Sequence, residues 1–423
     1  MYRKMLSFLE KSPVNAWAIH NIKETLEQAG FEKLPPAGTA LCPGGRYYTE
    51  RMGSAIMAFR LPQEAPKGFV IAAAHSDSPY LRLMDHAELT GEYVRLSVEK
   101  HGGLILSTWL DRPLSAAGTV MVKTEKGAEQ RLVDMKKPVA VIPSMAPHLR
   151  KGTLDPDMKK DMVALFAPGG KKGSFYQAVA RAAGCKEEDV LASDLFLYNA
   201  EKPSVWGPED EYISMPRLDD MACVFCILEG FLEAEATDRI QVMGIFDCEE
   251  VGSREPAGGG SDFMPRSLRR VAAGLGADEA AYDAMLDQSW LISSDNAHAV
   301  HPNYPELFHP TEYVRMNGGP VLKHSVRYTT DAVSTALFKA VCAGAGVPVQ
   351  EYSNRADLAG GATLGKIAME KTSLAAVDIG IAQLAMHSCY ETEGTLDTEY
   401  MVKAIKASFE SRVCFEGGSF TLE

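Results

Sequence analysis

The sequence predicts an α/β protein: a mostly parallel mixed sheet sandwiched by helices, of the zinc-exopeptidase type, with an inserted β-rich domain. Four long apolar runs without polar alternation are typical of strands that are covered on both faces. Helix-like segments separate these runs, and strands that alternate with helices favour parallel pairing. The chain has 423 residues, which is long for a single core and favours two domains.

The elements follow in order along the chain. Residues 1–30 contain interrupted apolar positions and are predicted to form helices. Apolar side chains recur at helical spacing over residues 333–341 and again over residues 402–409. Because ligands in such sheets bind beyond the carboxyl ends of the strands, the polar residues there are the candidate site. The four predicted strands, with their polar ends, are "GFVIAAAHSDSP", "RIQVMGIFDCEEVG", "SWLISSDNAHAVHP" and "SLAAVDIGIAQLAMHS".

The middle of the chain has a different pattern. Residues 93–204 contain shorter β-like stretches, such as "GTVMVKTEKG" and "KKPVAVIP", and a polar segment rich in Gly and Lys. We predict that they form an inserted β-rich domain for dimerisation or larger assembly. Residues 1–92 and 205–423 would then form one discontinuous catalytic domain.

Composition excludes several classes of protein. The formal net charge of −13 argues against a nucleic-acid binder, which usually presents a basic face. No stretch reaches the roughly 18 apolar residues of a membrane span. The eight cysteines are scattered without a disulfide framework, which favours a reducing cytoplasm. Cys223 and Cys226 form a CxxC inside an apolar helical run, and we predict buried thiols there.

Imidazoles and carboxylates gather at the predicted strand ends. These are the side chains that bind zinc or a similar divalent cation. Several carboxylates in one place would repel each other strongly without cations, so two metals fit better than one. The residues are His75, Asp77, Asp219, Asp220, Glu249, Glu250, Asp295, His298, His301 and His387.

Each of these clusters alone has an ordinary structural explanation, such as a buried histidine or a solvated turn, but five together favour a site. Neighbouring side chains on a strand point to opposite faces, so Glu249 and Glu250 are expected to have separate tasks. Asp77 returns to the face of His75 and could orient its ring. The adjacent glutamates do not suit glycoside hydrolysis, and the GxSxG and HExxH motifs are absent.

The motifs "HSDSP", "PRLDD", "DCEEVGS", "SSDNAHAVHPNY", "GPVLKH" and "LAMHS" resemble those of the aspartyl aminopeptidases, which are cocatalytic dizinc exopeptidases. The resemblance spans nearly the whole chain. It implies that His75 and Glu250 are zinc ligands, that Asp219 bridges both metals, and that Asp295 and His387 hold the other zinc. It also implies that Glu249 is the general base and that Asp77 orients His75.

The resemblance further implies a substrate pocket and an assembly. Two features depart from the family: Asp220 stands where Asn is usual, and the segment between Lys323 and Tyr328 is shorter than in eukaryotic members. Family members form tetrahedral dodecamers built from dimers, and we expect at least a homo-oligomer. The implied substrate-binding residues are His298, Lys323, Tyr328 and His148, the last reaching a neighbouring subunit's site.

The predicted function is hydrolysis of the N-terminal residue of a peptide with a free N-terminus, by a water that two metals activate. Zinc is the first expectation, with cobalt or manganese as alternatives. Lys323 is the candidate partner of an acidic side chain, which implies a preference for Asp or Glu. Two alternatives stay open: a dimetal amidohydrolase of N-acyl amino acids, and a non-catalytic, metal-stabilised oligomeric binding protein.

Overall fold

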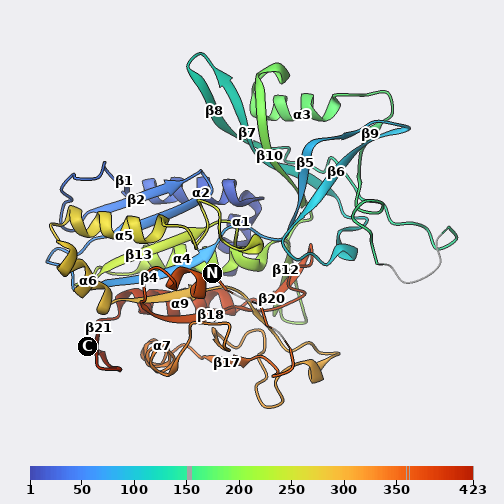
Figure 1. Ribbon diagram of the computed structural model, residues 1–423. Helices are drawn as coiled ribbons and strands as arrows, with labels where there is room; N and C mark the ends of the chain where they lie inside the picture. The colour runs from blue at the N-terminus through green and yellow to red at the C-terminus, as the bar shows by residue number, and fades with distance from the viewer. Residues whose placement is uncertain (150–154, 359, 362, 423) are drawn as a thin grey trace.

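The computed structural model describes residues 1–149, 155–358, 360–361 and 363–422, and its largest element is a nine-stranded sheet (Figure 1). Its four central strands, β13, β4, β14 and β18, pair in parallel, while β3 and β16 join antiparallel. The predicted mostly parallel mixed sheet is thereby confirmed. In sheet order the strands are β1 (Glu32–Lys33), β2 (Arg46–Arg51), β3 (Ala55–Arg60), β13 (Ile240–Phe246), β4 (Phe69–His75), β14 (Trp290–Ser294), β18 (Ala375–Gly380), β16 (Val321–His324) and β17 (Gln350–Ser353).

Helices cover both faces of this sheet, as predicted. Val70 and Ala72 of β4 pack with α1, α2, α4, α7 and α9, whereas Phe69 and Ile71 face α5, α6 and α8. All four side chains are fully buried, which explains why the run shows no polar alternation. The helices are α1 (Tyr2–Lys11), α2 (Asn15–Gln28), α4 (Leu218–Glu233), α5 (Phe263–Gly274), α6 (Glu279–Asp287), α7 (Ala332–Gly344), α8 (Leu364–Met369) and α9 (Asp397–Glu410).

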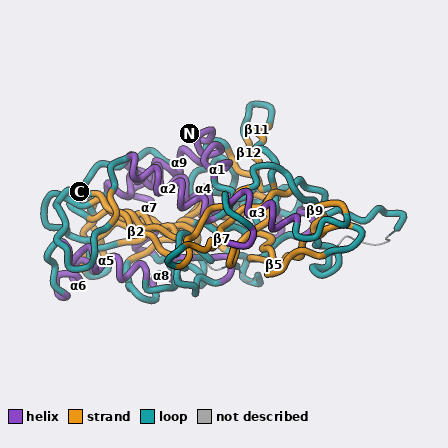
Figure 2. The backbone as a smooth tube through the Cα atoms, turned by 90° about the horizontal axis from the view of Figure 1, so that it is seen from above, coloured by secondary structure: helices purple, strands orange, loops and turns teal. Residues whose placement is uncertain are grey.

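A second, six-stranded antiparallel sheet lies at one end of the elongated molecule (Figures 1 and 2). It has its own apolar core, to which α3 (Ser174–Ala183) contributes Phe175 and Val179. The sheet starts before residue 93, because Leu81 and Leu83 of its strand β5 pack into that core. In sheet order its strands are β8 (Gly127–Asp134), β7 (Leu114–Thr124), β10 (Val190–Asn199), β5 (Tyr80–Leu89), β6 (Tyr93–His101) and β9 (Ala164–Pro168).

Smaller sheets complete the fold. The turn that follows β12 leads directly into α4, where Cys223 and Cys226 are free and buried, as predicted. Among the described residues, no helix is both long and apolar enough to cross a membrane. The remaining strands are β11 (Ser204–Trp206), β12 (Tyr212–Met215), β20 (Glu391–Gly394), β19 (Ala382–Leu384) and β15 (Ala297–His298) in a five-stranded sheet, and the pair β21 (Val413–Glu416) and β22 (Ser419–Leu422).

Candidate metal centre and active site

Three of the predicted strand ends meet at one edge of the nine-stranded sheet. β4 ends at His75, β14 ends just before Asp295, and β13 ends shortly before Glu249 and Glu250. The parallel pairing of these strands places their carboxyl ends together. The start of α4 brings Asp219 to the same place.

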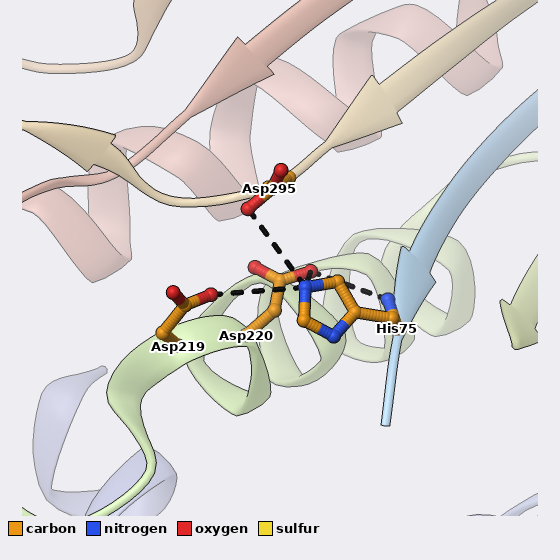
Figure 3. Close-up of side chains that lie close together, drawn as sticks. All are labelled: His75, Asp219, Asp220 and Asp295. Atoms are coloured by element: carbon orange, nitrogen blue, oxygen red, sulfur yellow. Dashed lines mark hydrogen bonds and ion pairs between the residues drawn. The ribbon is translucent and has the colours of Figure 1, made fainter. Parts of the chain in front are cut away.

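The first group of possible metal ligands contains His75, Asp219, Asp220 and Asp295 (Figure 3). One ligand atom from each lies within 4.8 Å of all the others. The Nε2 atom of His75 is 3.7 Å from Asp219 Oδ1, 3.8 Å from Asp295 Oδ1 and 3.9 Å from Asp220 Oδ2. All four residues are buried, so this is an enclosed cluster of one imidazole and three carboxylates.

The second group contains Asp219, Glu250 and His387, again within 4.8 Å of one another. The Nε2 atom of His387 is 3.6 Å from Asp219 Oδ2 and 3.8 Å from Glu250 Oε1. Asp219 therefore belongs to both groups, with Oδ1 toward the first and Oδ2 toward the second.

This grouping corrects the expected assignment of ligands to metals. His75 lies with Asp295, and Glu250 lies with His387, whereas the resemblance led us to pair His75 with Glu250. The reason is spatial: β4 and β14 are neighbouring strands, while the Glu250 and His387 segments both lie beyond the strand ends. The shared role of Asp219 remains compatible with the geometry.

Glu249 and Glu250 do not lie on a strand, so the expectation based on strand alternation is wrong. They occupy a short 3₁₀ helix, Glu249–Val251, because Cys248 adopts a left-handed conformation with φ of 63° and turns the chain. Both backbone N–H groups donate to the Asp77 carboxylate, at 3.0 Å and 3.2 Å. Glu250 belongs to the second ligand group and Glu249 to neither, and this separation arises in a turn and not on a pleated strand.

Asp77 also contacts the ring of His75. The His75 Nδ1 atom lies 3.0 Å from the Asp77 carbonyl oxygen and 3.4 Å from Asp77 Oδ1. This leaves Nε2 of His75 facing the carboxylates of the first group. Asp77 thus holds both an imidazole and the turn of the two glutamates.

Two further residues of the site were missed in the sequence. His101 Nε2 lies 2.9 Å from Asp77 Oδ2, and Glu391 accepts hydrogen bonds from the backbone N–H groups of Asp219 and His387. Neither lies at the end of a predicted strand of the main sheet. The Gly-Gly pair directly after His101 was the available signal, because it permits close approach of the backbone.

The residues present fit a bound cation pair. Asp219 Oδ1 and Asp220 Oδ1 are buried and have no hydrogen-bond partner among the described residues. Buried carboxylate oxygens without donors are costly unless a cation neutralises them. His387 donates from Nδ1 to the Gly103 carbonyl oxygen at 2.7 Å, which leaves its Nε2 free to act as a ligand.

The carboxylates of the centre are strained electrostatically without cations. The pKa of Glu249 is raised to about 7, mainly by burial, with the charges of Asp295, Asp77 and Asp219 acting in the same direction and His75 opposing them. Burial together with the charge of Asp295 raises the pKa of Asp219 to about 6. Divalent cations would stabilise the ionised forms of both residues.

A cavity of about 600 Å³ opens over the two groups. Lys323, Tyr328 and His298 line it together with Glu249, so the structure brings these expected substrate-binding residues to one place. Lys323 is buried. Its Nζ atom lies 3.5 Å from Asp295 Oδ2 and 5.7 Å from the centre of the Tyr328 ring. Burial, together with the charges of Lys323 and His387, lowers the pKa of His298 to about 4, so its ring is neutral at pH 7.

His148 lies elsewhere. It is exposed in a turn between β8 and β9 of the six-stranded sheet, and it is not among the residues that line the cavity of its own chain. Within one chain, the structure therefore does not bring His148 to the metal centre. His301, also at a predicted strand end, lies outside the cavity lining and stacks near Tyr304 with ring centres 5.1 Å apart.

Comparisons with known proteins agree with this arrangement. Residues 8–409 match the family described as aminopeptidase I zinc metalloprotease (M18). A probable M18 family aminopeptidase 2 of Clostridium novyi is 37% identical over 419 residues, which cover 95% of this chain and 97% of the relative. An aspartyl aminopeptidase of Caenorhabditis elegans is 33% identical over 450 residues, covering 97% and 95%.

Solved structures show the same fold. The cryo-EM structure of the Ape4 and Nbr1 complex matches with a TM-score of 0.93 and 30% identity, covering 96% of this chain and 85% of the other. The S. cerevisiae mApe1 dodecamer matches with a TM-score of 0.86 and 25% identity, covering 96% of both chains.

Proposed function

This chain belongs to the M18 family of zinc aminopeptidases. From that premise we propose that it uses two bound cations to remove N-terminal Asp or Glu from peptides. The observation that carries the proposal is the shared carboxylate of Asp219. Its two oxygens face two separate ligand groups, and both groups open into the cavity that contains Glu249. A carboxylate shared by two ligand groups, beside a glutamate that belongs to neither group, fits hydrolysis by a water that two metals activate.

The ligand groups supply two cation positions. His75, Asp220 and Asp295 with Asp219 would hold the first cation, and Glu250 and His387 with Asp219 would hold the second. Bound there, zinc would polarise the scissile carbonyl and lower the pKa of a water molecule. We assign zinc as the native metal on the family description and on the mixture of imidazole and carboxylate ligands.

Glu249 is the proposed general base. It lies in the same cavity as both groups, and its backbone is fixed by Asp77. Its carboxylate takes a proton from the attacking water and transfers it to the leaving amine of the peptide. The breaking bond is the first peptide bond, and the products are a free amino acid and a shortened peptide.

Lys323 is the proposed determinant of the acidic preference. Its ammonium group is buried at the cavity wall, where Asp295 and the Tyr328 ring hold it. A buried cation attracts the carboxylate of an N-terminal Asp or Glu. An apolar side chain of the substrate offers the cation no partner and is therefore disfavoured. His298, neutral at pH 7, would donate a hydrogen bond to the oxyanion that forms during attack.

The assembly is proposed from a relative. The S. cerevisiae mApe1 structure is a dodecamer, and this chain matches it over 96% of its length. We propose a homo-oligomer in which His148, exposed on the six-stranded sheet, reaches the cavity of a neighbouring subunit. All eight cysteines are free, and we propose the cytoplasm as the compartment.

A substrate panel tests the proposed activity. Peptides with N-terminal Asp, Glu, Leu or Lys, together with N-acetyl-Asp, are assayed with protein loaded with zinc, cobalt or manganese. We expect turnover of the Asp and Glu peptides and none of the N-acylated substrate. Preferred hydrolysis of N-acetyl-Asp would show an amidohydrolase instead. No hydrolysis of any substrate by protein that holds two cations would show a non-catalytic binding protein.

The variant Glu249→Gln tests the base. The amide cannot accept a proton, so we expect kcat to fall by about 10²–10⁴-fold. Metal content should stay unchanged, because Glu249 belongs to neither ligand group. Glu255→Gln, an exposed change in the same loop, is the control and should keep full activity. Near-normal turnover by Glu249→Gln would contradict the assignment.

A further inference from the structure

Three successive residues at the end of strand β6 contact the metal centre: His101, the last residue of the strand, and Gly102 and Gly103, which follow it. Each contacts a different part of the centre. We propose that this segment, residues 101–103, is a positioning element that holds the second cation position and the catalytic turn in place. The proposal deepens the two-cation function and rests on it.

His101 fixes Asp77. Its Nε2 atom lies 2.9 Å from Asp77 Oδ2, and its ring packs near Phe196 and Tyr80 with ring centres 5.6 Å and 6.2 Å away. The residue is 9% exposed, so both packing and the hydrogen bond define the orientation of its ring. Asp77 in turn accepts the two N–H groups of the glutamate turn, so His101 acts on that turn through Asp77.

Gly102 makes room for Glu250. A Cβ atom at this position would lie 2.7 Å from Glu250 Oε2 and 3.0 Å from Glu250 Cβ. Gly102 also has a positive φ of 81°, which only glycine adopts without strain. The Glu250 side chain therefore packs directly against the backbone of Gly102.

Gly103 holds His387. Its carbonyl oxygen accepts the hydrogen bond from His387 Nδ1 at 2.7 Å, and this fixes the tautomer that presents Nε2 to a cation. Two residues later, the N–H of Ile105 donates to the His387 carbonyl oxygen at 3.1 Å. Both the ring and the backbone of His387 are thus bound to one stretch that follows β6.

The two cation positions differ in this respect. Glu250 and His387, which define the second position, both rest directly on residues 102–103. The first position uses His75, which the segment reaches through Asp77 and, among the described residues, through no direct hydrogen bond. A disturbance of the segment should therefore weaken the second cation more than the first.

The test compares two glycine variants in the holoprotein. Gly102→Ala introduces the clash with Glu250, while Gly170→Ala has a similar φ of 77° but meets nothing within 4 Å. Both therefore carry the same kind of backbone strain. We expect Gly102→Ala to bind its second zinc about 10–100-fold more weakly, measured by titration against a chelator, and Gly170→Ala to match the wild type.

A second pair of variants tests His101 by rescue. We expect His101→Ala to lower kcat by about 10–100-fold with little change in KM, and His101→Gln, whose amide can donate to Asp77, to recover most of that loss. Neither change requires a positive φ, so this pair decides the matter should Gly102→Ala fail to fold. A purely structural role would not distinguish Gln from Ala in folded protein.

The outcomes separate this proposal from the proposed function. Wild-type second-zinc affinity in Gly102→Ala, or equal kcat in His101→Ala and the wild type, would overturn the positioning role while the aminopeptidase activity stood. If the wild type hydrolyses no peptide, and the Gly102→Ala variant nevertheless binds its second zinc more weakly than the wild type, the positioning role is supported and the proposed function is overturned.

Discussion

The two proposed cation positions are built in different ways from one shared carboxylate. The first takes His75 from the end of a central strand, and that side chain is 1% exposed. The second takes His387 from a turn beyond β19, and that side chain is 34% exposed. The sheet itself defines the first position, whereas the second depends on loops that the six-stranded sheet supports. We therefore expect the first cation to bind more tightly and to exchange more slowly.

The largest effect should come from Asp219→Asn, because Asp219 serves both positions. The amide has the same shape but lacks the charge that bridges the two groups. We expect activity to fall by at least about 10³-fold and metal content to fall below two cations per chain. Elemental analysis of dialysed protein measures this.

Asp262→Asn, an exposed change at the start of α5, is the control for Asp219→Asn and should match the wild type. Retention of two tightly bound cations by Asp219→Asn would show that the two positions do not share this residue.

A smaller effect is expected for Lys323→Met, which keeps the length of the side chain and removes its charge. Lys323 lies beside the candidate ligand Asp295 but is not itself a ligand. The variant therefore tests whether substrate preference can change separately from metal binding at the first position. We expect kcat/KM for an N-terminal Asp peptide to fall by about 30-fold or more relative to a Leu peptide. Lys403→Met, on the exposed face of α9, should leave the ratio unchanged. An unchanged ratio in Lys323→Met would remove Lys323 from the specificity assignment.

The smallest effect is expected for Asp220→Asn. Asp220 Oδ2 accepts a hydrogen bond from the backbone N–H of His75 at 3.2 Å, and an Asn side-chain oxygen could accept it instead. The variant removes one negative charge from the first position only. We expect the first cation to bind about 10-fold more weakly, with turnover at saturating zinc within about threefold of the wild type. A weaker second cation instead would contradict the grouping of ligands.

The difference between the positions also explains what the sequence could predict. The continuous apolar run of β4 predicts a buried strand that ends at His75, and the same holds for β14 and Asp295. The apolar pattern was sufficient to predict these two positions, because each candidate ligand lies at or directly after the end of its strand. The resemblance supplied the roles of Asp219, Glu249 and Glu250.

The pairing of ligands could not be predicted in the same way. Glu249 and Glu250 lie in a 3₁₀ turn, and His387 has a φ of 66°, so neither segment follows a strand period. The support of His387 comes from Gly103, which is 284 residues away in the sequence. Periodicity carries no information on such a contact, and His101 and Glu391 were missed for the same reason.

Titration of cobalt into the metal-free protein tests the central claim most directly. Binding is followed by the visible spectrum and turnover of an N-terminal Asp peptide is measured at each addition. We predict two binding steps, with the first cation binding tightly and turnover rising mainly with the second. Full turnover with one cation per chain would contradict a centre in which Asp219 joins two cooperating positions.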